Sequence, residues 1–322
     1  MTEKNYKLDY EEWVDLNGDR QNIRIRSQNQ TNPVILFLHG GPGVCDRHRV
    51  LQYQSVIADE FTIVLWDQRG SGKSYRKSIK NETLNVGKYV EDAKSLVEYI
   101  CTKFNKDKII IEGHSWGTVI GTLLISKHPE HIAAYIGQGQ FANGIENERI
   151  SYEFCLNEAK KLGDKKAISK LEGNGPVNGV YPNDNAMLTQ RNYLTRYGGG
   201  DYKDRSGVMK SVIMPLLKTK EYKLRDIPGY AKGALYLSSA LWEDVVACDF
   251  IGTVKKLDIP VLLTMGKHDY NTPTELAKQW FDNLEAPYKD MITFEESAHS
   301  PLKEEPEKWG SAVRKFCSEY GK

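Results

Sequence analysis

The stretch that decides the fold is IIIEGHSWGT, residues 109–118. Its three consecutive isoleucines predict a strand that is buried on both faces of a sheet. The chain then passes through GHSWG (113–117) into WGTVIGTLLISKH (116–128), which predicts a helix. A serine between two glycines, at a sharp turn from a strand into a helix, is typical of a nucleophile elbow.

Each residue of this turn has a physical task. Gly113 and Gly117 leave room where side chains would collide with the neighbouring strand and helix. The sharp turn strains the backbone at Ser115 and pushes its hydroxyl clear of the sheet. Because Trp116 begins the helix, its N–H points to the same side and can donate a hydrogen bond to an oxyanion.

Strands and helices alternate on both sides of the elbow. A hairpin is predicted around Asn17-Gly18 and an amphipathic helix from Val86 to Phe104, with Thr83 as its N-cap. Because such alternation produces βαβ units, we expect a mostly parallel sheet with helices on both faces. The other predicted strands are VILFLH (34–39), FTIVLW (61–66), IAAYIGQGQ (132–140), IPVLLTMG (259–266) and DMITFEE (290–296), and the later helices are 272–284 and 304–320.

The alternation stops in the middle of the chain. Residues 144–255 read as polar helical segments around a bend rich in Gly, Pro and Asn, without a strand signal. The sequence therefore predicts an α/β fold with an inserted helical cap. Its core comprises residues 1–143 and 256–322, and its cap comprises residues 144–255.

A serine hydroxyl needs a base and an acid that orients this base. With such an elbow, the acid and then the histidine follow the serine along the chain. Asp269 comes directly after one predicted strand, and His299 directly after the next. Both therefore lie at the edge of the sheet that carries Ser115, where open α/β sheets place their sites. These three residues are the candidate catalytic triad.

The loop LFLHGGPG (36–43) ends the first buried strand. Its glycines let the backbone approach a ligand closely, and the proline stiffens the loop. We expect the N–H of Gly41 to be the second oxyanion donor, opposite that of Trp116.

A second glycine-rich segment, GSGKS (70–74), resembles the end of a phosphate-binding loop. That pattern requires a glycine where this chain has Asp67, and no strong helix signal follows the segment. We therefore expect a structural role, in which Asp67 and Arg69 pair with each other and hold the loop beside the site.

Five motifs together resemble one family. HGGPG (39–43), DQRGSGKS (67–74), GHSWG (113–117), GKHD (266–269) and SAHS (297–300) are similar to motifs of the proline iminopeptidases, which belong to the α/β-hydrolase superfamily. The resemblance implies an α/β-hydrolase fold with a helical cap over a Ser-Asp-His site. It also implies release of an N-terminal residue, usually proline, from peptides.

The resemblance gives roles to individual residues. Ser115 would be the nucleophile, His299 the base, Asp269 its orienting acid, and Gly41 and Trp116 the oxyanion donors. In the family, cap acids hold the free amino group of the substrate. Glu243, Glu146 and Glu148 are the candidates for this role here.

Two departures leave the substrate open. His114 replaces the glycine that usually precedes the serine, and the cap lacks a clear tryptophan-rich signature. An aminopeptidase of the proline iminopeptidase type is our first prediction. A carboxylesterase or another small-acyl hydrolase with the same triad is the alternative, and a non-catalytic binding protein is disfavoured because the triad and the oxyanion loop are complete.

Composition and charge limit the kinds of molecule that this protein is expected to bind. The net charge of +1 favours neither nucleic acid nor a membrane surface, so we expect a small molecule or a short peptide as substrate. The first residues show no apolar stretch of a signal peptide, and five scattered cysteines suit reduced thiols in the cytoplasm. No metal-binding motif is present, and we predict neither a metal nor a cofactor.

Overall fold

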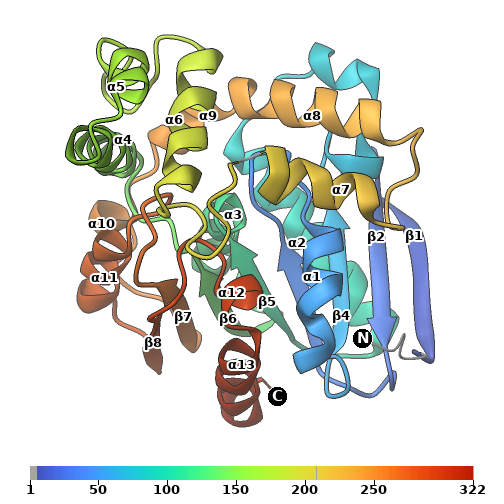
Figure 1. The fold of residues 1–322 in the computed structure, drawn as a ribbon. Coiled ribbons are helices and arrows are strands. Elements are labelled where there is room, and N and C mark those ends of the chain that lie inside the picture. The colour runs from blue at the N-terminus through green and yellow to red at the C-terminus, as the bar shows by residue number, and fades with distance from the viewer. Residues whose placement is uncertain (1–5, 208, 322) are drawn as a thin grey trace.

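The computed structural model describes residues 6–207 and 209–321. Residues 1–5, 208 and 322, which belong to the predicted core and cap ranges, lie outside this part. The described residues form an eight-stranded sheet in the order β1-β2-β4-β3-β5-β6-β7-β8 (Figure 1). The strands are β1 Leu8–Leu16, β2 Asp19–Ser27, β3 Val34–Leu38, β4 Thr62–Asp67, β5 Ile109–His114, β6 Ile132–Gln138, β7 Val261–Gly266 and β8 Lys289–Phe294.

The sheet is parallel except at one edge. β2 runs antiparallel to both β1 and β4, and all other neighbours are parallel. The predicted hairpin is confirmed: Asn17 and Gly18 join β1 to β2 with φ values of 50° and 75°. Two positive φ angles give a turn whose twist matches that of the flanking strands.

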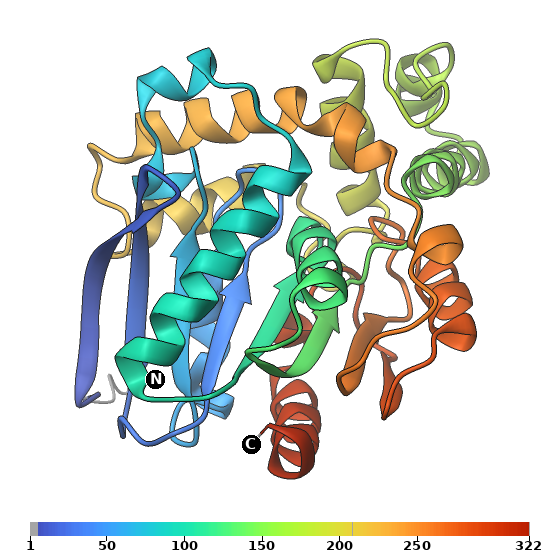
Figure 2. The same cartoon turned by 180° about the vertical axis from the view of Figure 1, so that it is seen from behind.

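Helices cover both faces of the sheet (Figures 1 and 2). One face packs against α2 (Val86–Phe104), α3 (Trp116–Lys127) and α11 (Thr274–Asn283), and the other against α1 (Arg47–Tyr53) and α13 (Pro306–Tyr320). Side chains of β3 divide between the two apolar clusters: every second one faces α2, and those between them face α13. The continuous apolar run of this strand therefore reflects burial on both sides.

Three local predictions differ from the structure. The N-cap of α2 is Asn85, whose side chain accepts the N–H of Lys88 at 2.9 Å, and not Thr83. The predicted last helix is divided into α12 (Pro301–Glu304) and α13, because Pro306 lacks an N–H and restricts the residue before it. Helix α1 was not predicted, and short helices at Gln54–Val56 (η1), Gly72–Ser74 (η2) and Lys77–Asn81 (η3) complete the core.

Between β6 and β7 the described residues form helices without a strand. The two ends of this helical segment lie side by side, because Gly144 N–H donates to Cys248 O and Phe250 N–H donates to Ala142 O. The predicted boundaries of the cap at residues 144 and 255 stay predictions. The helices are α4 Gly144–Lys161, α5 Lys165–Leu171, α6 Asp184–Arg196, η4 Met209–Ile213, α7 Met214–Lys218, α8 Ile227–Ala240, α9 Trp242–Val246 and α10 Phe250–Thr253.

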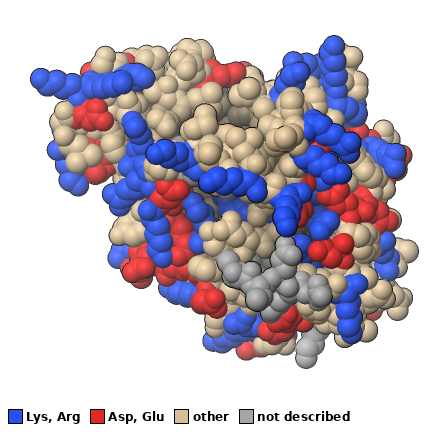
Figure 3. All heavy atoms as spheres, turned by 45° about the vertical axis from the view of Figure 1, so that its right-hand side comes forward, with Lys and Arg blue, Asp and Glu red and all other residues tan. Residues whose placement is uncertain are grey.

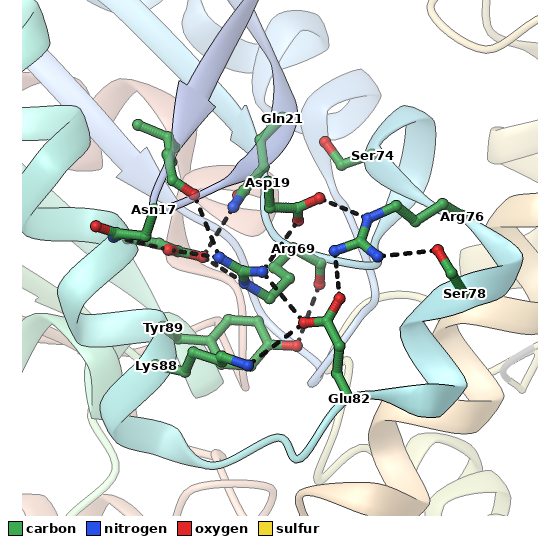
Figure 4. A network of polar contacts seen from close by, with 12 residues as sticks. Asn17, Asp19, Gln21, Arg69, Ser74, Arg76, Ser78, Glu82, Lys88 and Tyr89 are labelled. Atoms are coloured by element: carbon green, nitrogen blue, oxygen red, sulfur yellow. Dashed lines mark hydrogen bonds and ion pairs between the residues drawn. The ribbon is translucent and has the colours of Figure 1, made fainter.

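The loop after β4 is held by buried ion pairs, but not in the predicted way. Arg69 donates two hydrogen bonds to Asp92, at 2.7 and 2.9 Å, at the centre of the network in Figure 4. Asp67 instead pairs with Arg47 at 3.0 Å and accepts the hydroxyl of Tyr222 at 2.9 Å. The predicted pairing of Asp67 with Arg69 is therefore wrong, since each side chain points to a different element. Asp67 links the core to the helical segment that contains Tyr222.

The surface drawn in Figure 3 intersperses basic and acidic side chains, as the small net charge suggests. Over the described residues, no helix is both long and apolar enough to cross a membrane.

Candidate active site

The elbow between β5 and α3 has the predicted strain. Ser115 has φ 55° and ψ −118°, a positive φ that a side-chain-bearing residue rarely adopts. A Cβ atom at Gly117 would lie 1.8 Å from the carbonyl oxygen of Leu38, and one at Gly113 would lie 2.7 Å from the carbonyl oxygen of Gly117. Both glycines are therefore required by the close contact of α3 with β3 and β5.

The predicted acid and base form a hydrogen-bonded pair. His299 Nδ1 lies 2.9 Å from Asp269 Oδ2, and both residues are buried. The other carboxylate oxygen of Asp269 accepts the N–H groups of Asn271 and Thr272 at 2.8 and 2.9 Å. Backbone N–H groups that follow Asp269 thus hold its carboxylate, and this carboxylate orients the imidazole of His299.

The environment keeps the other ring nitrogen of His299 available as a base. Burial lowers the pKa of His299, and the attraction of Asp269 offsets this effect only in part. Since Nδ1 faces the carboxylate, it carries the proton in the neutral ring, and Nε2 then has a free lone pair.

Ser115, His299 and Gly41 line one cavity of about 510 Å³ between the core and the helical segment. This volume is that of a typical small-molecule site. The glycine-rich loop runs beside the serine, because a Cβ atom at Gly40 would lie 3.3 Å from Ser115 Cβ. As the first residue of α3, Trp116 has no partner for its N–H within the helix. The N–H of Trp116 therefore lies without an intrahelical partner next to Ser115, and the glycine-rich loop passes the same serine.

The three predicted cap acids are not among the residues that line this cavity. Glu243 is exposed on α9, and Glu146 pairs with Arg149 at the surface of α4. Glu148 is buried, where it accepts two hydrogen bonds from Arg191, at 2.7 and 2.8 Å. The structure brings Arg191 to the cavity wall and leaves Glu148 behind it.

The sequence interpretation missed a buried pair beside the triad. Asp46 Oδ2 lies 3.3 Å from His114 Nδ1, and His114 Nε2 lies 3.0 Å from the carbonyl oxygen of His299. Burial raises the pKa of Asp46, but the hydrogen bond and charge of His114 outweigh it and bring the value to about 2. The available signal was the charged tract DRHR (46–49), which begins three residues after the end of the glycine-rich loop.

The walls of the cavity differ in character. Its apolar wall comes from the helical segment, and its polar wall comes mainly from the parts of the core that follow β3 and β8. The polar wall contains Asp46, Arg49, Asp201, Ser300 and Lys303, and the apolar wall contains Met187, Leu188, Leu194, Leu216, Leu235 and Trp242.

Comparison with known proteins agrees with this architecture. Residues 33–166 match the family described as alpha/beta hydrolase fold. The chain is 29% identical to the "Probable aminopeptidase YbaC" of Bacillus subtilis (strain 168), over 94% of this chain and 95% of that protein. It is 23% identical to a proline iminopeptidase of Heyndrickxia coagulans, over 96% of this chain and 98% of that protein.

A solved structure extends the agreement to three dimensions. The proline iminopeptidase of Mycobacterium smegmatis superimposes with a TM-score of 0.64 at 14% identity, covering 97% of this chain and 99% of that one. At this identity the likeness concerns the fold alone. The chain therefore has the α/β-hydrolase fold, and the resemblance to proline iminopeptidases predicted from its motifs is confirmed.

Proposed function

We propose that this protein is a serine hydrolase that releases the N-terminal residue from short peptides. The observation that carries the proposal is the Asp269–His299 pair, hydrogen-bonded at 2.9 Å, in a cavity that Ser115 also lines. The relatives named aminopeptidase and proline iminopeptidase support the choice of peptides.

The proposed reaction has two halves. His299 takes the proton of Ser115 while the hydroxyl oxygen attacks the carbonyl carbon, and the oxyanion accepts hydrogen bonds from the N–H groups of Gly41 and Trp116. His299 then gives this proton to the leaving amine, and the C–N bond breaks. Water, deprotonated by the same imidazole, then attacks the ester on Ser115. His299 returns this proton to the Ser115 oxygen as the ester bond breaks, and the first residue is released.

An aminopeptidase must also recognise a free amine, and Asp184 is the candidate that the cavity offers. It lies on the same face of α6 as Met187 and Leu188, and all three line the cavity. Among the described residues, no basic side chain forms an ion pair with it. Asp46 and Asp201, the other lining acids, face His114 and Lys303. Asp184 therefore replaces the three predicted acids in this proposal.

A carboxylesterase is the second candidate. It is favoured by the apolar wall and by the position of the predicted amine-binding acids outside the cavity. An ester substrate needs the same triad and the same oxyanion donors, but no acid for an amine.

The deciding experiment compares the 4-nitroanilides of proline, leucine and N-acetyl-leucine with a short 4-nitrophenyl ester. Turnover of the free-amine anilides, lost on acetylation and reduced about 10-fold or more in Asp184→Asn, is the expected result. The matched control is Asp258→Asn, which changes an exposed acid away from the cavity.

Turnover of the ester alone would assign the esterase. Ser115→Ala should abolish either activity, with a fall in kcat of about 10⁶-fold. Retained activity in this variant would contradict the mechanism itself.

A further inference from the structure

The polar wall of the cavity adjoins the triad on the side of His299. Ser300 follows His299 directly, and its hydroxyl lies 3.3 Å from Nη1 of Arg49, on α1. Both residues line the cavity together with Ser115. His299 is the group that protonates the leaving amine in the proposed reaction, so this wall lies where the leaving group must depart.

Most charges that line the cavity have a partner of opposite sign. Arg191 is bound by Glu148 at 2.7 Å, and Lys303 forms an ion pair with Asp201. Arg49 differs from both, because no carboxylate among the described residues forms an ion pair with it.

The hydrogen bond to Ser300 uses only one donor of the guanidinium. Asp46, three residues before Arg49, lies 3.3 Å from His114; the charge of Arg49 also lowers the pKa of Asp46, but the two side chains form no ion pair. A half-buried guanidinium at the wall of a cavity retains donors that match a carboxylate in geometry and charge.

We propose that Arg49 binds a carboxylate on the leaving group, so that the preferred substrates are dipeptides with a free C-terminus. In a dipeptide, the scissile nitrogen and the carboxylate belong to the same residue. A leaving group held near His299 therefore places its carboxylate within reach of the neighbouring Arg49. The identification of the substrates as dipeptides rests on the proposed function. The recognition of an anionic leaving group by Arg49 does not depend on it.

The apolar wall complements this assignment. It faces the cavity from α6, α7, α8 and α9, and among the described lining residues it offers no cation other than the neutralised Arg191. The side chain of the first residue belongs there, and the charged end of the substrate belongs at α1. The cavity would then bind the apolar N-terminal side chain of a dipeptide at one wall and its C-terminal carboxylate at the other.

The test compares two pairs of substrates that differ by one negative charge. The first pair is leucyl-alanine and leucyl-alanine amide, and the second is 3-acetoxybenzoate and its methyl ester. We expect kcat/KM to favour the anionic member by about 10- to 100-fold, mainly through KM, as for a hydrogen bond between charged groups. Arg49→Gln should reduce the ratio of kcat/KM between the anionic and the other member to about 1, and Arg49→Lys should retain part of the preference. The control Arg225→Gln alters a strongly exposed arginine and should leave the ratio unchanged.

The outcomes separate the inference from the proposed function. Hydrolysis of the acetoxybenzoates alone would replace the peptidase by an esterase, and the ester pair would still measure the role of Arg49. Equal kcat/KM for both members of the hydrolysed pair in the wild-type protein would overturn the inference. A preference that survives in Arg49→Gln would also overturn it. Because each result is a ratio within one protein, partial unfolding of a variant cancels.

Discussion

The two sides of the cavity differ in what lines them: hydrogen-bonded polar groups on the core side and mostly apolar side chains on the helical side. On the core side, polar groups are held by short hydrogen bonds, as Asp269 is held by the N–H groups of Asn271 and Thr272. On the helical side, the lining is mostly apolar and some of its leucines are exposed: Leu188 is 48% and Leu235 is 61% accessible. The core therefore holds polar atoms in fixed positions, whereas the helical segment supplies an apolar surface that a substrate can contact.

This difference indicates where chemistry and substrate choice reside. Proton transfer requires groups placed within about 0.5 Å, which packed strand ends can provide. An apolar wall distinguishes substrates by volume, and one methylene group typically changes kcat/KM by about 10- to 200-fold. We therefore expect substitutions in the core to change the rate for all substrates and substitutions in the helical segment to change their ranking.

The largest effect is expected for Asp269→Asn. The amide retains the shape of the side chain but favours the wrong tautomer of His299, so kcat should fall by about 10⁴-fold for every substrate. Steady-state kinetics on an anilide and an ester would check this, with circular dichroism to confirm folding. A loss confined to one class of substrate would break the division between the two sides.

The elbow should be the most sensitive point of the core. In Gly117→Ala, the new methyl group would meet the carbonyl oxygen of Leu38, and we expect a loss of about 3 kcal/mol of unfolding free energy. Gly163→Ala is the control: φ is +66° there and no atom lies within 4 Å, so only backbone strain of about 1 kcal/mol is expected. Urea denaturation measures both, and equal losses would show that the contact at the elbow is relieved by a backbone shift.

A smaller effect is expected on the helical side. Ala234 on α8 lines the cavity, so Ala234→Leu should fill it and lower kcat/KM for a leucyl substrate relative to an alanyl one by about 10-fold. Ala240→Leu alters the same helix outside the cavity and should leave this ratio unchanged. Equal losses for both substrates in Ala234→Leu would show that α8 affects the catalytic groups themselves.

Local sequence patterns were sufficient for the buried strands of the core and for the elbow. The apolar runs of β3 to β7 and the glycines around Ser115 have their causes within a few residues, as the 1.8 Å clearance at Gly117 shows. The order of Asp269 and His299 after consecutive strands predicted that they would meet. Even the strain at Ser115 was predictable, because it follows from a strand that turns directly into a helix.

The cavity walls could not be predicted in the same way. Glu148 and Asp184 are both acids on helices after β6, and only the packing of Arg191 shows that the first is neutralised. Arg49 lies on a helix that gave no periodic signal, and its partner Ser300 is distant in sequence. Which polar group faces the cavity depends on tertiary contacts that no local pattern encodes.

The pH dependence should show the smallest change and report on both sides of the cavity. Because burial lowers the pKa of His299, the base stays neutral below the usual histidine value, and the acid limb of kcat/KM should lie below pH 6.5. The charge of Arg49 contributes to this lowering, so Arg49→Gln should move the limb to higher pH, and salt should weaken the difference.

Glu304 must be controlled in this measurement, because burial and the charge of Asp201 raise its pKa to about 7. Its carboxylate accepts the N–H of Ala298, next to the base, at 2.8 Å. A limb that moves with Glu304→Gln but not with Arg49→Gln would assign the titration to the loop that carries His299. A limb that moves with Arg49→Gln would instead place the guanidinium within electrostatic reach of the base, as binding of the leaving group at α1 requires.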